Sequence, residues 1–180
     1  MEKQQKDNGI GMNIQLNGDD SAEIGIPEGI IDVGLTVMEA QDGARTGCAR
    51  RIESMDSKRK QPLGYDTSDA WRNDIEGACA EFAYCKARGI HWSRSVNTFK
   101  DADCGHLTQV RWTHHINGSL IVRDGDPDDH CYVLVVGACP SYRVIGWIKG
   151  EDAKKNDYIK SPGELEPAYF VPQNKLSSAW

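Results

Sequence analysis

The chain has 180 residues, of which 39% are hydrophobic and 27% are charged. This length fits one domain of ordinary size, and the apolar content is sufficient for a core, so the composition excludes a wholly disordered chain. The net charge of −6 lies entirely in residues 1–76, which carry 9 Lys and Arg against 15 Asp and Glu, whereas residues 77–180 carry 12 of each. A high-affinity, non-specific DNA-binding protein usually shows the opposite balance.

The sequence predicts neither a membrane span nor a secreted protein. No apolar run approaches the roughly 18 residues that a bilayer crossing needs, and the polar start MEKQQKDNG is not followed by the apolar segment of a secretory signal. The six cysteines are too sparse for a small disulfide scaffold, and four of them lie in helical or strand patterns. We therefore expect free, mostly buried thiols and a cytoplasmic location, which is the cytoplasm of the host cell if a phage encodes the chain.

Residues 1–62 are predicted to form an acidic, loosely structured extension, and residues 63–180 the domain proper. Residues 1–29 are rich in Gly, Asn, Asp and Gln, with at most a short strand at Met12–Leu16, and Ile30–Ala40 fits a short helix or strand. The charged stretch Arg45–Lys60 is interpreted as a solvated helix face or a loop rather than a nucleic-acid patch. The breaker at Gln61–Gly64 marks the expected boundary.

A helix is predicted from Trp71 to Arg88, with Ser68 or Asp69 able to cap its start and Gly89 ending it. Apolar residues recur in it at three- and four-residue spacing and predict one buried face, made of Trp71, Ile75, Ala78, Phe82 and Cys85.

Strand patterns follow this helix along the rest of the chain. They are predicted at His106–Thr113, Ser119–Arg123, Tyr132–Ala138, Tyr142–Ile148 and Ala168–Val171, with one helical turn at Glu151–Lys155. Turn signals at Asn117-Gly118 and Pro140-Ser141 predict hairpins. The expected fold class is therefore α/β, with a mixed central β-sheet, a packed N-terminal helix and an irregular N-terminal extension.

Polar residues that bear chemistry occur in a characteristic order. Glu81 lies on the helix, Asp103 lies before the first clear strand, and Gln109-Val110-Arg111 lies on that strand. Later in the chain a strand ends in Gly-Trp at Gly146-Trp147. In this order the segment from about Trp71 to Leu176 resembles the PD-(D/E)XK nuclease superfamily, in particular its small bacteriophage-encoded members.

The resemblance implies a restriction-endonuclease-like fold and a metal-dependent nuclease that hydrolyses DNA phosphodiester bonds. Mg²⁺ or Mn²⁺ would be the cofactor, because hydrolysis needs a positioned water and neutralisation of the phosphate charge. The family pattern places the metal at Asp103, the side chain of Gln109, the carbonyl of Val110 and Glu81, and it places Arg111 at the phosphate. The catalytic set is then Glu81, Asp103, Gln109 and Arg111.

Two departures from the family pattern favour an alternative. Gln stands at position 109 where Glu is commonest, and Arg at 111 where Lys is usual, and an Arg does not release its proton at ordinary pH. The alternative is a catalytically eroded binding module with the same fold, such as a phage protein that binds or inhibits a host protein through the acidic N-terminal segment.

Each site residue also has a purely structural interpretation. Glu81 fits a solvated helix residue, Asp103 a turn residue before Gly105, and Gln109 with Arg111 an exposed strand face. A zinc site at Cys79, Cys85, Cys104 and His106 lacks the usual ligand spacing, so buried thiols are expected instead. The Asp-rich segment 124–129 lacks the downstream Glu of a calcium loop and is expected to be a hairpin loop.

Overall fold

The computed structural model describes residues 29–57, 69–96, 102–105, 107–163 and 166–178. Their elements are β1 (Ile31–Gly34), α1 (Val37–Asp56), α2 (Ala70–Arg88), β2 (Thr108–Thr113), β3 (Leu120–Val122), β4 (Cys131–Ala138), β5 (Ser141–Lys149), α3 (Gly150–Ala153), β6 (Ile159–Lys160) and β7 (Ala168–Val171), with single 3₁₀ turns at Asn156–Tyr158 and Gln173–Lys175. The expected mixed α/β fold, with a mixed sheet and packed helices, is confirmed.

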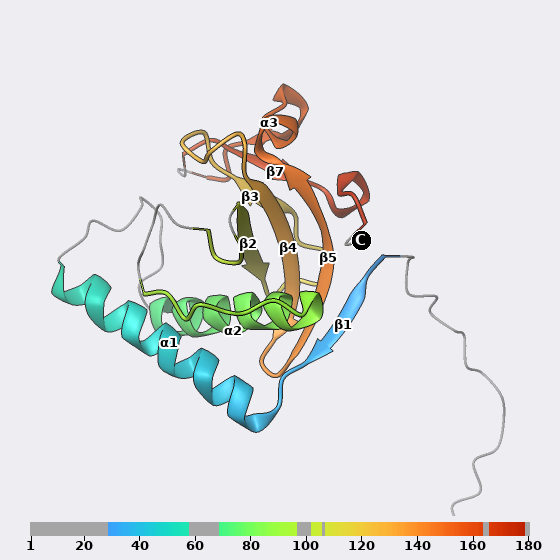
Figure 1. Ribbon diagram of the computed structural model, residues 1–180. Coiled ribbons are helices and arrows are strands. Elements are labelled where there is room, and N and C mark those ends of the chain that lie inside the picture. Colours follow the sequence, from blue (N-terminus) through green and yellow to red (C-terminus); the bar gives the residue numbers. More distant parts are fainter. Residues whose placement is uncertain (1–28, 58–68, 97–101, 106, 164–165, 179–180) are drawn as a thin grey trace, which may run out of the picture.

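A four-stranded sheet in the order β1-β5-β4-β2 forms the middle of the molecule (Figure 1). β4 and β5 form an antiparallel hairpin, β1 pairs antiparallel with β5, and β2 pairs parallel with β4. The hairpin expected at Pro140-Ser141 is therefore confirmed. β2 is an outer strand, because it pairs only with β4 within this sheet.

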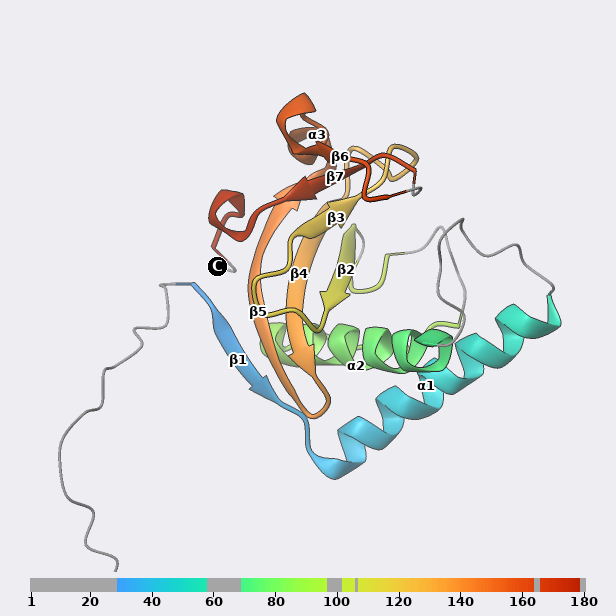
Figure 2. The same ribbon diagram turned by 180° about the vertical axis from the view of Figure 1, so that it is seen from behind.

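The second hairpin, expected at Asn117-Gly118, is wrong. β3 does not pair with β2; it joins β7 and β6 in a separate three-stranded sheet, seen with α3 at the far end of the molecule from α1 and α2 in Figure 2. The physical reason is the parallel pairing of β2 with β4, which requires the chain to cross over between them, and β3 lies within that crossover.

Two cores occupy the two faces of the central sheet. Val133 and Val135 of β4 pack with α2 on one face, whereas Leu134 and Val136 pack with β3 and β7 on the other. This is the alternation that a strand buried on both faces must show, and it explains why β4 is a nearly continuous apolar run.

Residues 31–56 belong to the fold, so the expectation of a loosely structured extension is wrong for them. β1 adds an edge to the central sheet, and Thr36 then caps α1 through a capping box with Glu39. α1 packs along α2 because two glycines on one face allow close approach: a Cβ at Gly43 would lie 2.5 Å from Sγ of Cys79, and one at Gly47 would overlap the backbone of Ile75. The expected boundary at Gln61–Gly64 and the strand at Met12–Leu16 lie outside the described residues.

The buried surface of α2 differs from its prediction in part. Ala78 and Cys85 are fully buried and Gly89 ends the helix with a positive φ of 62°, as expected. Trp71 is 44% exposed, whereas Glu81 is buried. A single apolar face does not describe this helix, because the sheet covers one side of it and α1 covers another.

Candidate functional site

Asp103 lies at the open edge of the central sheet. Its Oδ2 accepts a hydrogen bond of 2.8 Å from the backbone N–H of Val110 in β2. The N–H and C=O of one strand residue point to the same side of the strand, so the Val110 carbonyl shares this edge with the Asp103 carboxylate. Two of the oxygens expected to bind the metal are therefore neighbours.

Glu81 lies in the interior of the molecule between α1 and α2. Its side chain is 8% exposed, and both of its oxygens accept hydrogen bonds from Arg50 of α1, at 2.6 and 2.7 Å. The indole N–H of Trp92 donates a further bond of 3.3 Å to Oε2. A carboxylate in such a place needs a charged partner, and Arg50 provides it. The interpretation of Glu81 as a solvated residue is therefore wrong.

Asp103 and Glu81 lie close enough to influence each other electrostatically. Burial, followed by the negative charge of Glu81, raises the pKa of Asp103 to about 7. The Val110 N–H and the cations Arg111 and Arg50 oppose this rise. The structure thus brings Glu81, Asp103 and Arg111 of the predicted set into one charged cluster, and it adds Arg50 to them.

Arg111 and Gln109 leave β2 on the face opposite to the Val110 side chain, by strand alternation. The guanidinium of Arg111 donates to Asp126 at 3.0 Å and lies over the ring of Tyr132, 5.2 Å from its centroid. Nε of Arg111 is buried and makes no hydrogen bond within the described part of the chain. Gln109 is half-buried on the same strand.

A lysine holds the Asp-rich loop that supports Arg111. The ammonium of Lys154 donates to the carbonyls of Asp124 and Asp126 at 2.8 and 2.6 Å, and it pairs with the carboxylate of Asp128 at 2.6 Å. The ammonium of Lys154 is thus the cation that the oxygens of this loop surround. The loop is a support for Asp126. It connects β3 to β4, which lie in different sheets, so the expectation of a hairpin loop is wrong.

A disulfide joins Cys85 to Cys104, with their Cα atoms 6.3 Å apart. The expectation of free thiols is wrong for these two residues, because the last turn of α2 and the segment before β2 lie side by side. The disulfide also removes both residues as zinc ligands. Cys79 is free and buried, as expected, and burial followed by its neighbour Cys139 raises its pKa to about 12. His106 lies outside the described residues.

Arg50 was missed because the stretch Arg45–Lys60 was interpreted as a solvated face. One signal could have found it. Gly43 and Gly47 are four residues apart, a spacing typical of closely packed helices, and Arg50 follows three residues later on the same face. Arg45, which the helical period places on nearly the opposite side of α1, is 71% exposed.

Asp103 offers a carboxylate oxygen and Val110 a backbone carbonyl at the open edge of β2, and oxygens of this kind are what Mg²⁺ and Mn²⁺ prefer. Gln109 lies on the same strand, one residue before Val110. Both oxygens of Glu81 are occupied by Arg50. The described residues contain no group of three or more His, Cys, Asp or Glu side chains placed to hold a metal ion.

Comparisons with known proteins give no relative. No family model, no curated protein and no solved structure matches the chain. Of the helices in the described ranges, none combines the length and apolarity that a membrane crossing requires.

Proposed function

We propose that the chain is a metal-dependent nuclease that hydrolyses DNA phosphodiester bonds, with a PD-(D/E)XK-like site at the open edge of β2. The observation that supports this most is the Asp103 carboxylate, which is fixed on the Val110 amide beside Glu81 and has a pKa raised to about 7. A buried carboxylate whose pKa is raised by a neighbouring acid is a frequent feature of sites that bind a cation or transfer a proton.

Each of these residues has a separate role in the proposed site. Asp103 and the Val110 carbonyl would hold the Mg²⁺ or Mn²⁺ ion, with Gln109 as a third donor. The bound ion supplies charge neutralisation and an activated water. Arg111 holds the attacked phosphate by its guanidinium, and Asp126 orients that guanidinium from behind. Glu81, fixed by Arg50 and Trp92, keeps the local potential negative at Asp103.

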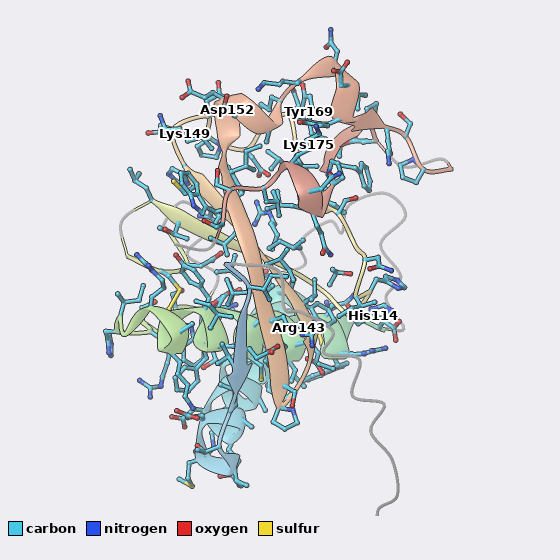
Figure 3. The ribbon with its side chains drawn as sticks, turned by 90° about the vertical axis from the view of Figure 1, so that its right-hand side faces the viewer. His114, Arg143, Lys149, Asp152, Tyr169 and Lys175 are labelled. Carbon is cyan, nitrogen blue, oxygen red and sulfur yellow. A yellow bond between two sulfur atoms is a disulfide. The ribbon has the colours of Figure 1, made fainter. Side chains whose placement is uncertain are left out.

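A specific observation also favours the second candidate, an eroded binding module. Most cations in the described ranges are already paired with acids. Figure 3 shows Arg143 and Lys149 on one side of the molecule, and these pair with Asp32 at 2.8 Å and Glu151 at 2.9 Å. Such a surface has little free positive charge to attract a DNA backbone. In this candidate the partner is a host or phage protein bound through the acidic residues before Pro62.

A cytoplasmic location remains part of the proposal, and the disulfide provides a test of it. Cytosolic proteins rarely keep a disulfide. If the chain works in a reducing cytoplasm, alkylation of intact cells before lysis should label Cys85 and Cys104 as thiols. Protection of both residues would place the protein in an oxidising compartment.

Cleavage of single-stranded, duplex and branched DNA tests the nuclease directly. Wild-type protein should cut at least one substrate with Mg²⁺ or Mn²⁺ and none with EDTA. Asp103→Asn should reduce cutting on the order of 10²-fold or more, the size of effect seen when one charged contact of an active site is lost. Asp157→Asn, at an exposed position, is the matched control. Cutting that survives Asp103→Asn would reject this site, and no cutting of any substrate would favour the binding module.

A further inference from the structure

Arg50 joins three segments at the candidate site. It projects from α1, donates to both oxygens of Glu81 on α2, and donates from Nε to the carbonyl of Ser95 at 2.9 Å. The Arg50 and Glu81 side chains are 15% and 8% exposed. The pair is therefore a buried salt bridge and not a surface ion pair.

The geometry of this pair limits what Glu81 can bind. An ion bridging Glu81 and Asp103 would need a Glu81 oxygen, and each of them already receives a guanidinium N–H at 2.7 Å or less. Displacing the guanidinium would leave a buried cation without its carboxylate, which is strongly unfavourable.

The charges lead to the same limit. Arg50 is paired to Glu81 and Arg111 to Asp126, so among the described residues Asp103 is the acid of the pair that makes no salt bridge of its own. One divalent ion at Asp103 reverses the local charge from negative to positive, and a second would add to a positive field in a poorly solvated place.

We infer that the Arg50 guanidinium takes the place of one cation at the acid pair, so that the site binds at most one divalent ion, held by Asp103 and not by Glu81. This rests on the proposed function, and it names Arg50 as a positioning residue. Phosphodiester hydrolysis at this site then proceeds with one metal ion and not with a pair.

Mn²⁺ binding, measured by the electron paramagnetic resonance signal of the free ion, tests the inference without any cleavage. Wild type should bind one ion. Arg50→Gln frees Glu81 and should bind a second ion, or the first about tenfold or more tightly. Arg45→Gln, an exposed change on the same helix, should match wild type.

The double variant Arg50→Gln/Glu81→Gln guards against a single variant that fails to fold. It preserves the net charge and replaces the ion pair by two amides. It should still bind one ion, with affinity within about threefold of wild type. In ¹⁵N NMR spectra, the indole N–H signal of Trp92 should move in both variants and stay in place in Arg45→Gln, because this N–H donates to Glu81.

The outcomes separate this inference from the proposed function. Two ions in wild type, loss of binding in the double variant, or an Arg50→Gln protein that is folded and binds like wild type would overturn the inference alone. Binding by Arg50→Gln but not by wild type would reject the nuclease, and it would also contradict the single ion that the inference expects at Asp103 in wild type. If no variant binds Mn²⁺, both fail.

Discussion

Replacing Asp103 by Asn should stabilise the protein, and more so at high pH. The pKa of Asp103 is raised from an ordinary value of 3.8 to about 7, first by burial and then by Glu81. Between these two values the folded state holds the proton more tightly than the unfolded state, so stability falls as pH rises through this window and stays low above it. About three pKa units correspond to an upper limit of roughly 4 kcal/mol at pH 8.

Asn removes this penalty and keeps an oxygen that can accept the hydrogen bond from the Val110 N–H. Urea unfolding in EDTA should therefore show Asp103→Asn more stable than wild type by up to about 4 kcal/mol at pH 8, and by much less at pH 4.5. Asp157→Asn should change neither value by more than about 0.5 kcal/mol. The reasoning would be refuted by an Asn variant that is no more stable than wild type at pH 8, or by a gain that is the same at both pH values.

Three further predictions concern the scaffold around the site. Gly47→Ala should lower the free energy of unfolding in urea by about 1–3 kcal/mol, because the added Cβ meets the backbone of α2. Gly77→Ala, with open space around its Cβ, should raise this free energy by about 1 kcal/mol. Equal effects of the two changes would argue against close packing of α1. Reduction of the disulfide between Cys85 and Cys104, which are 19 residues apart, should lower the free energy of unfolding by about 3 kcal/mol. Alkylation of the unfolded, unreduced protein should label four of the six cysteines, and labelling of all six would refute the disulfide. Lys154→Met should make the 124–129 loop the first site of proteolysis, and an unchanged cleavage pattern would show that Lys154 does not hold this loop.

The fold could be predicted from the sequence where a local pattern dominates. The end of α2 at Gly89 and the central position of β4 were both predictable. A helical period, a left-handed glycine and a continuous apolar run can each be recognised within a short segment of sequence. The partners of β2 and β3 could not be predicted this way. Asn117-Gly118 favours a hairpin locally, and the parallel pairing of β2 with β4 overrides it.

The candidate site shows the same division. The order Glu81, Asp103, Gln109, Arg111 included three residues, Glu81, Asp103 and Arg111, that influence one another electrostatically in the structure. The role of Glu81, however, depends on Arg50, which is 31 residues away in the chain. Composition placed Arg50 in a charged, solvated stretch, whereas the contact of α1 with α2 shows that its charge is buried. The same holds for Cys104, whose partner is fixed by the return of the chain to the end of α2.

A crystal soaked in Mn²⁺ provides the most direct test of the central claim, because the anomalous scattering of manganese locates the ion itself. We predict one peak at the open edge of β2, at about 2.1 Å from an Asp103 carboxylate oxygen and beside the Val110 carbonyl, with Arg50 still bound to Glu81. No peak at Asp103 at saturating Mn²⁺, or a peak between two Glu81 oxygens released from Arg50, would contradict this account.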